Sequence, residues 1–270
     1  MHLSIALTIA GSDSGGGAGV QADLKTFHAF GVFGTSAVTA VTVQNTRGVS
    51  GVHPIPLETV RGQIDAVVED LRPAALKSGM LATAELVDVV GDAIRDHGLD
   101  RYVLDPVMVA TSGGRLLDKN AEQRIASQLV PIATLVTPNL HEARVLTGLS
   151  VSSVDGMRDS ARALVDMGAK AALVKGGHLA DDEAVDLYWD GTEERTWRRP
   201  RMSTSNTHGT GCTLSAAVTA CLALGLDLRL AVDRAIDFVA RAIAEAPGLG
   251  SGYGPINHFV GADPTSEPDR

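Results

Sequence analysis

Residues 206–212 (Asn-Thr-His-Gly-Thr-Gly-Cys) form the most informative stretch of this sequence. Two glycines and small polar residues stand directly before an apolar segment that is typical of a buried helix. The first N–H groups of a helix have no partner within it, and the helix dipole makes that end positive. Glycine lets these groups converge on an anion such as a phosphate. An ordinary cap formed by Thr207 or Thr210 needs one such residue, so the repeated glycines favour anion binding.

Other polar groups stand where strands are expected to end. Lys175 closes an apolar run and is followed by Gly176 and Gly177, and a lysine there can place a point charge on phosphates. Asp105, before a proline, can help to position a metal or can bond to nearby backbone N–H groups. Asn139 and Glu142 are spaced as a helix capping box, and Glu142 can also enter a water network around magnesium. Glu142 can fill the capping role and the magnesium role at the same time.

The two cysteines receive different interpretations. Cys212 begins the helix, and we expect the dipole there to lower the pKa of its thiol. Cys221 falls on the apolar face of the same helix and is expected to be a small buried hydrophobe. Nine helical residues separate the two by roughly 13 Å, so they cannot form a disulfide within that helix. The histidines lack the spacing of zinc ligands and are expected in loops or at the surface: His141, His178, His208 and His258.

Residues 11–19 are rich in glycine but fit neither familiar nucleotide motif. Gly17 and Ala18 occupy the Lys and Ser/Thr positions of a Walker loop that would begin at Gly11. A dinucleotide fingerprint that begins at Gly15 would end on Val20 where it needs glycine. The spacing leaves two interpretations open: a strained turn with positive φ angles, or a turn that lets a ligand approach the backbone.

The elements that would position these groups alternate along the chain. Apolar or β-branched runs predict strands at residues 3–10, 35–43, 74–78, 102–105, 134–137 and 171–175, with helices at 20–30, 56–71, 86–94, 154–167, from 207 onward and at 228–246. This alternation predicts an α/β three-layer sandwich, a mostly parallel central sheet with helices on both faces. Residues 185–189 and 195–197 flank Asp190-Gly191 and predict a small antiparallel hairpin at the sheet edge. Ligands of such sheets bind at the carboxyl ends of the strands.

Length and composition bound the remaining possibilities. We expect one domain over residues 1–261 and a disordered polar tail over residues 262–270. The net charge of -9 disfavours nucleic acids and anionic membranes as partners, because both need a basic surface. The first residues show no basic region before an apolar run, and no apolar run approaches the roughly 20 residues of a membrane span. We therefore expect a cytoplasmic protein.

Together these stretches resemble the ribokinase-like superfamily, and within it the bacterial hydroxymethylpyrimidine/phosphomethylpyrimidine kinases. The resemblance runs from about residue 3 to residue 259 and includes residues 6–13, 16–25, 43–46, 77–80, 105–108, 137–139, 142, 175–178, 207–212 and 252–259. It implies a ribokinase-like fold and ATP- and Mg²⁺-dependent phosphorylation of 4-amino-5-hydroxymethyl-2-methylpyrimidine, and of its monophosphate, in thiamine biosynthesis. It also implies a homodimer.

The resemblance also implies roles for single residues. Gln44 would recognise the aminopyrimidine, because its amide offers a donor and an acceptor side by side. The hydroxymethyl oxygen would be held by Asp23, the ring by Met80 and Val107, and the backbone at Gly11 and Ala18 would complete the pocket. ATP would be bound by Asn139, Lys175, Thr210 and Gly211, and magnesium would be supported by Glu142 and Asp105. The catalytic group would comprise Cys212, Lys175, Gly209 and Gly211.

Two points stay open at this stage. Most of the superfamily has an aspartate as general base where this chain has Cys212, and a cysteine would serve only if the helix lowers its pKa. The alternatives are a pyridoxal kinase with the same phosphate site and a non-catalytic pyrimidine-binding domain. Gln44 argues against the first, and the expected phosphate site argues against the second.

Overall fold

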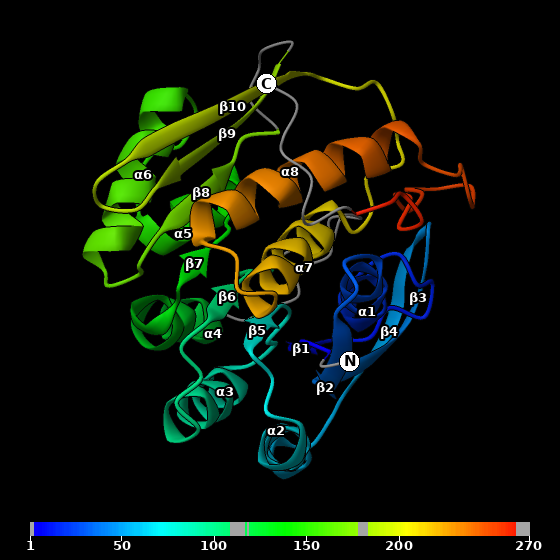
Figure 1. Ribbon diagram of the computed structural model, residues 1–270, viewed down its shortest axis with the longest axis vertical. Coiled ribbons are helices and arrows are strands. Elements are labelled where there is room, and N and C mark those ends of the chain that lie inside the picture. The colour runs from blue at the N-terminus through cyan, green and yellow to red at the C-terminus, as the bar shows by residue number, and fades with distance from the viewer. Residues whose placement is uncertain (1–2, 109–116, 118, 178–182, 263–270) are drawn as a thin grey trace.

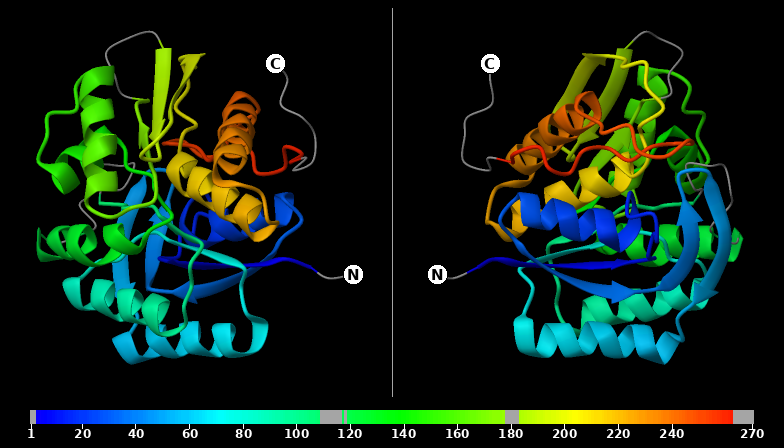
Figure 2. Two further views of the ribbon diagram at one scale, coloured as in Figure 1. Left: turned by 60° about the vertical axis from the view of Figure 1, so that its left-hand side comes forward. Right: turned by 90° about the vertical axis from the view of Figure 1, so that its right-hand side faces the viewer.

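The computed structural model describes residues 3–108, 117, 119–177 and 183–262. In these residues an eight-stranded sheet lies between two layers of helices, as Figures 1 and 2 show. Its strands are β1 (Ile5–Ala10), β2 (Phe33–Val38), β5 (Ala75–Ser78), β6 (Tyr102–Leu104), β7 (Leu135–Val136), β8 (Ala172–Lys175), β9 (Glu183–Trp189) and β10 (Glu194–Pro200). The α-helices are α1 (Gly19–Ala29), α2 (Leu57–Leu71), α3 (Ala84–Asp96), α4 (Lys119–Arg124), α5 (Leu140–Thr147), α6 (Val154–Asp166), α7 (Thr210–Ala223) and α8 (Leu228–Ala244). A π-helical turn (Ile125–Leu129) and a 3₁₀ turn (Val130–Ile132) follow α4. The predicted three-layer architecture is confirmed.

The order of the strands brings the predicted site residues together at the carboxyl ends of the parallel strands. Across the described residues the order is β10-β9-β8-β7-β6-β5-β1-β2. The pairs from β2 to β8 are parallel, so their carboxyl ends meet on the same side of the sheet. The pairs β8–β9 and β9–β10 are antiparallel, which confirms the edge hairpin predicted around Asp190-Gly191.

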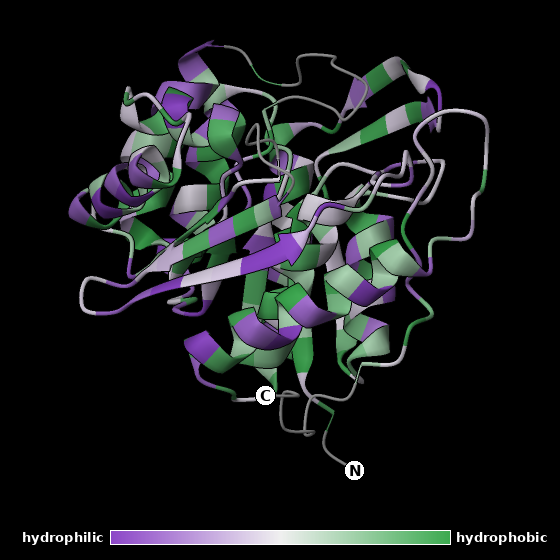
Figure 3. Cartoon of the chain, turned by 90° about the horizontal axis from the view of Figure 1, so that it is seen from above, coloured by the Kyte–Doolittle hydropathy of each residue, from purple (hydrophilic) through white to green (hydrophobic). Residues whose placement is uncertain are grey.

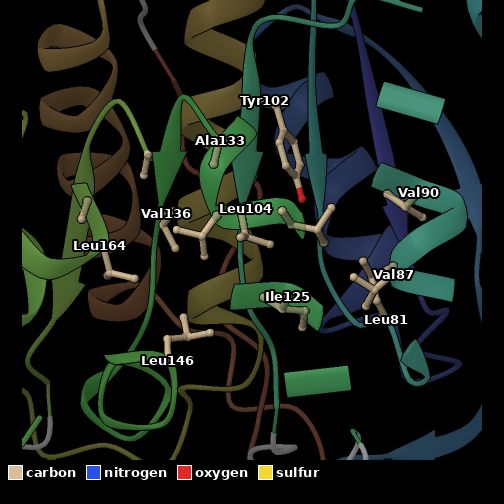
Figure 4. Packing of buried hydrophobic residues seen from close by; sticks show 14 of the residues in the cluster. Leu81, Val87, Val90, Tyr102, Leu104, Ile125, Ala133, Val136, Leu146 and Leu164 are labelled. Carbon is tan, nitrogen blue, oxygen red and sulfur yellow. The ribbon is translucent and has the colours of Figure 1, made fainter. Parts of the chain in front are cut away.

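Side chains of successive strand residues point to opposite faces and build two cores. On β1, Leu7 and Ile9 face α2 to α6, whereas Ala6 faces α1, α7 and α8. On β6, Tyr102 and Leu104 belong to the first core and Val103 to the second. Figure 4 shows the first core from close by, and Figure 3 shows that the helices carry both hydrophobic and hydrophilic residues along their length. Burial on both faces explains the continuous apolar runs of the sequence.

One predicted strand is two strands in different sheets. The run over residues 35–43 divides at Thr39, where β2 ends and β3 (Ala40–Asn45) begins. β3 pairs with β4 (Gly48–Pro54) as a separate two-stranded hairpin, which the sequence analysis missed. Because an isolated hairpin is marginally stable, it needs external support. The glycine-rich turn supplies it: Ser12 donates its N–H to the Ala40 carbonyl oxygen (2.8 Å) and accepts at its own carbonyl from the Thr42 hydroxyl (2.7 Å).

Two further expectations concern the surroundings of this domain. Of the tail predicted over residues 262–270, all but residue 262 lie outside the described residues. Within the described residues, none of the helices is long and apolar enough to cross a membrane.

Candidate active site

The start of α7 has the geometry of an anion site. Its N-cap is Gly209, with φ +82°, and among the described residues no side chain caps the helix there. The Thr210 hydroxyl turns back to the Thr207 carbonyl oxygen (2.7 Å), so the interpretation of either threonine as an ordinary cap is wrong. A Cβ at Gly209 would lie 1.8 Å from the Gly17 carbonyl oxygen, so glycine is required where the two glycine-rich segments meet.

The turn over residues 11–19 is built around a carboxylate that the sequence analysis overlooked. Asp13 accepts hydrogen bonds from the N–H groups of Gly15, Gly17 and Ala18 at 2.8–3.0 Å. It also lies 2.8 Å from the His208 Nε2 atom. Burial raises the pKa of Asp13, but these hydrogen bonds outweigh it and hold the pKa below its usual value. With Gly16 and Gly19 at positive φ, the interpretation as a strained turn is supported.

An ion pair that reaches the surface lies beside the first turn of α7. Lys175 Nζ is 3.0 Å from Asp105 Oδ1, and the lysine side chain keeps 16% of its surface exposed. A Cβ on Gly211 would lie 3.2 Å from Lys175 Nζ, which places the ammonium group against the helix start. Asp105 is buried and also accepts from the hydroxyls of Thr137 and Ser215, each at 3.3 Å. Burial alone would raise the pKa of Asp105, but Lys175 and Lys77 lower it, so it is ionised.

Asn139 and Glu142 form the predicted capping box at the start of α5. The Asn139 side chain accepts from the Glu142 N–H (3.0 Å), and Glu142 Oε2 accepts from the Asn139 N–H (2.8 Å). Glu142 is 4% exposed, and burial together with the Asp105 charge raises its pKa to about 7, against the attraction of Lys175. The cap is confirmed, and a carboxyl group with a pKa near neutrality lies beside the Lys175–Asp105 ion pair.

These carboxylates fit magnesium in one way and not in another. The described residues contain no cluster of three or more His, Cys, Asp or Glu side chains that would form a protein cage for a metal. Asp105 already has three partners, and Glu142 is held by the backbone N–H groups of Asn139 and Met108. Magnesium commonly keeps several waters and binds mainly to nucleotide phosphates. The donor set therefore fits an ion that Glu142 and Asp105 reach through water.

Cys212 does not have the lowered pKa that its position predicted. Loss of water around the thiol raises its pKa to about 11, although the Lys77 charge and the Gly19 N–H favour the thiolate. The helix start is positive, but it does not offset this desolvation. Neither Cys212 nor Cys221 is in a disulfide, and Cys221 is buried as predicted.

A second ion pair lies wholly inside the protein beneath Cys212. Lys77 Nζ is 2.8 Å from Asp23 Oδ1, and both side chains have no exposed surface. The other Asp23 oxygen accepts from the Thr8 hydroxyl at 2.6 Å. A carboxylate so enclosed has no surface for a hydroxymethyl oxygen, so the predicted substrate contact of Asp23 does not fit this structure. Lys77 received no role from the sequence, although a lysine within an apolar strand that ends in Ser-Gly was a visible signal.

The predicted heterocycle residues lie around the same sheet edge. A Cβ on Gly11 would lie 2.4 Å from the Met80 methyl carbon, so this glycine leaves room for that side chain. The Gln44 side chain lies on the inner face of β3, with one end of its amide 3.2 Å from the Thr42 hydroxyl oxygen and the other end 3.3 Å from His208 Nε2. Val107 is half-buried two residues after Asp105. The Ala18 N–H is used by Asp13, so this residue offers a ligand no free donor from its N–H.

The histidines were expected in loops or at the surface, and those in the described residues differ in burial. His208 is 12% exposed in its side chain and joins Asp13 to Gln44. His258 is buried and bonds to the Thr213 hydroxyl at 2.9 Å, whereas His141 is exposed. His178 lies outside the described residues. Both His208 and His258 lie in loops, as expected, but segments far apart in sequence cover their rings.

The chain is similar to known kinases over nearly its whole length. The model of the family described as phosphomethylpyrimidine kinase matches residues 13–257. A hydroxymethylpyrimidine/phosphomethylpyrimidine kinase of Bacillus subtilis is 49% identical over 261 residues, 96% of each chain. One from Streptomyces coelicolor is 48% identical over 94% of each chain.

Solved structures agree with this fold. The pyridoxal kinase of Staphylococcus aureus in complex with AMP-PCP and pyridoxal has a TM-score of 0.89 and 37% identity, covering 97% of this chain and 95% of that one. A phosphomethylpyrimidine kinase from Clostridium difficile has a TM-score of 0.80 and 39% identity, covering 88% of this chain and 99% of that one.

Proposed function

The chain belongs to the phosphomethylpyrimidine kinase family, and we propose that it transfers a phosphoryl group from ATP to the hydroxymethyl group of 4-amino-5-hydroxymethyl-2-methylpyrimidine and to the resulting monophosphate. The observation that carries this proposal is the start of α7, which has no side-chain cap in the described structure and lies against the Lys175 ammonium group. A binding domain for an uncharged pyrimidine has no use for such a site. The product would serve thiamine biosynthesis.

The residues of this site would act mainly by electrostatics. In phosphoryl transfer, charge on the moving group is spread over its oxygens, and enzymes contribute positioning and charge neutralisation. The N–H groups from Gly209 to Cys212 would receive the phosphoryl oxygens, and Lys175 would balance their charge. Asn139 and Thr210 would line the ATP side. Magnesium, held through water by Glu142 and Asp105, would neutralise further phosphate charge.

Cys212 would rarely be free to act as a base at neutral pH. A thiol with a pKa of about 11 is almost wholly protonated, so proton removal before the transfer is disfavoured. A loose transition state needs little early proton removal, so the transfer would not depend at its start on a Cys212 thiolate. We expect Cys212→Ala to lower turnover far more than pyrimidine affinity; wild-type turnover would remove Cys212 from the mechanism.

Gln44 supports a pyrimidine over pyridoxal as the substrate. Its amide complements an exocyclic amine beside a ring nitrogen, whereas pyridoxal offers a phenol oxygen. The pyridoxal kinases among the similar structures favour a second candidate activity, because they share the fold at a TM-score of 0.89. Met80 and Val107 would contact either ring from its faces.

A coupled assay of ADP release with hydroxymethylpyrimidine, its monophosphate and pyridoxal tests the function. We expect turnover with both pyrimidines and a much lower kcat/KM with pyridoxal. No ADP release with any of the three compounds would contradict a kinase of this kind. A higher kcat/KM with pyridoxal would make pyridoxal kinase the better-supported activity.

Gly209→Ala tests the phosphate site itself, and Gly225→Ala is the matched control. Both residues have φ above +80°, but a Cβ at Gly225 meets nothing within 4 Å. The first variant should lose ATP binding and turnover, and the second should lose only stability, by about 1 kcal/mol. ATP affinity unchanged in Gly209→Ala would argue against phosphate binding there.

Two properties complete the proposal. Val41 and Val43 are 47% and 64% exposed on the separate hairpin. A second copy of the chain would cover these apolar side chains, which supports the homodimer implied by family resemblance. Sedimentation of wild type and of Val43→Lys tests it. Dependence on ATP supports a cytoplasmic location, which cell fractionation tests.

A further inference from the structure

The Gln44 amide lies between two groups whose own hydrogen bonds decide which way it faces. One end is 3.3 Å from His208 Nε2, and the other is 3.2 Å from the Thr42 hydroxyl oxygen. A half-turn exchanges the oxygen and nitrogen of an amide without changing its shape, so the neighbours determine the orientation. The backbone of Gln44 is fixed separately, because its N–H and carbonyl both bond to the Ser14 hydroxyl at 2.8 Å.

His208 cannot accept a hydrogen bond from the Gln44 amide. Asp13 is an ionised carboxylate held by three backbone N–H groups, and it can only accept. The 2.8 Å contact between Asp13 and His208 Nε2 therefore places a proton on that nitrogen. A nitrogen that carries a proton cannot accept from an NH₂ group, so the end of Gln44 near His208 is its carbonyl oxygen.

Thr42 independently requires a donor from Gln44. Its hydroxyl has one hydrogen, and the carbonyl oxygen of Ser12, at 2.7 Å, is the nearer and stronger acceptor for it. The hydroxyl oxygen then offers a lone pair to Gln44 at 3.2 Å. The end of Gln44 near Thr42 is therefore its NH₂ group, which is the same orientation that His208 requires.

We infer that His208 and Thr42 are positioning residues that fix the direction of the Gln44 amide and thereby the substrate's pattern of donors and acceptors. This inference rests on the proposed function. The exocyclic amine would donate to Gln44 on the His208 side, and the ring nitrogen would accept from it on the Thr42 side. A ring with the opposite pattern would face donor against donor and acceptor against acceptor, and the hydrogen bonds of His208 to Asp13 and of Thr42 to Ser12 prevent the amide from turning to suit it.

The matching probe is the 4-oxo analogue of the pyrimidine, which presents a carbonyl oxygen and a ring N–H in place of the amine and ring nitrogen. We expect the wild-type protein to prefer the amino compound by about 100-fold or more in kcat/KM, because both hydrogen bonds are lost and buried polar groups are left unpaired. In Thr42→Val and in His208→Leu the amide can turn, so this preference should fall by about 10-fold. The change should be in KM for the amino compound, with KM for ATP and kcat within about threefold.

Thr35→Val is the matched control. Thr35 is a buried threonine on β2 whose hydroxyl also bonds to a carbonyl oxygen, that of Ala6, at 2.9 Å. Its loss should leave the preference between the two compounds as in wild type. General damage lowers turnover of both compounds together, so a change in their ratio separates positioning from stability.

The outcomes are distinct for the inference and for the proposed function. Wild-type protein that phosphorylates neither compound would contradict the proposed function. Wild-type protein that accepts both equally would leave the kinase intact and overturn the inference. An unchanged ratio in both Thr42→Val and His208→Leu would also overturn it, because the amide would then be fixed by other groups.

Discussion

Two lysine–aspartate pairs lie under the first turn of α7, and they differ in their access to the surface. Lys77 and Asp23 have no exposed surface, and the Thr8 hydroxyl and the Cys212 carbonyl oxygen, 3.5 Å from Lys77 Nζ, complete a closed group. In the other pair, Lys175 keeps 16% of its side chain exposed next to Gly211. Both pairs consist of a lysine and an aspartate and lie against the same helix. They differ in exposure to solvent, and this difference separates their roles.

The closed pair holds the site together, whereas the open pair can meet a ligand. Lys77 connects β5 to α1 through Asp23 and to α7 through Cys212. Burial would lower the pKa of Lys77, but Asp23, Cys212 and Asp105 outweigh it and raise the pKa, so the ammonium group is retained. No phosphate can reach it in this conformation. Lys175 has the same charge and can exchange its partner for phosphate oxygens.

The largest expected effect is on stability, from Lys77→Met. Removing one member of a buried pair leaves Asp23 without its counter-charge, which should lower the free energy of unfolding by about 3–5 kcal/mol. Urea denaturation measures the change. Lys170→Met, at an exposed lysine before β8, should change it by less than about 0.5 kcal/mol. Equal stability of the two variants would show that the closed pair contributes nothing to holding the site.

Lys175→Met should affect activity more than stability. Loss of a charge from the transition state should lower kcat/KM by about 10²–10³. The stability loss should be smaller than for Lys77→Met, about 1–2 kcal/mol, because Asp105 keeps the hydroxyls of Thr137 and Ser215. Steady-state kinetics with Lys170→Met as control measure the first effect. Activity within twofold of wild type would contradict a phosphate role for Lys175.

Glu142, beside the open pair, gives the site a pH dependence near neutrality. Its pKa is raised from 4.5 to about 7, so the folded protein binds this proton more tightly than the unfolded chain. Its contribution to stability is present below about pH 4.5 and is lost as the pH rises through 7. With about 1.4 kcal/mol for each tenfold change in proton affinity, the loss is about 3 kcal/mol. Denaturation of wild type and Glu142→Gln across this window, without nucleotide, should show the difference; parallel curves would contradict it.

How far the sequence could predict this site depends on the distance between the partners. The parallel sheet and the Asn139–Glu142 cap follow from local patterns, and the structure confirms both. Burial of Lys77 and Asp23 depends on contacts between β5 and α1, 54 residues apart, so no local pattern showed that the pair is closed. The prediction of a lowered pKa for Cys212 was wrong for the same reason. The helix start can be recognised from local sequence, but the burial that raises the pKa depends on distant segments. The β3–β4 hairpin was missed where one β-branched run changes sheet at Thr39.

The smallest expected effect is the sharpest test of the comparison. If the closed pair acts through its mutual contacts, replacing the whole group by apolar residues of similar size should remove the unpaired charge that makes Lys77→Met unstable. The triple variant Thr8→Val, Asp23→Leu, Lys77→Met leaves the Cys212 carbonyl oxygen bonded to the Ser215 hydroxyl (3.1 Å). Its unfolding free energy should lie within about 1.5 kcal/mol of wild type, since apolar replacement of buried ion pairs is often neutral. The equivalent change at the open pair, Asp105→Leu with Lys175→Met, should restore no activity, because the positive charge itself is what the phosphate needs. A triple variant as unstable as Lys77→Met would show that the closed pair's charge, and not its enclosure, supports α7, and the distinction between the two pairs would fail.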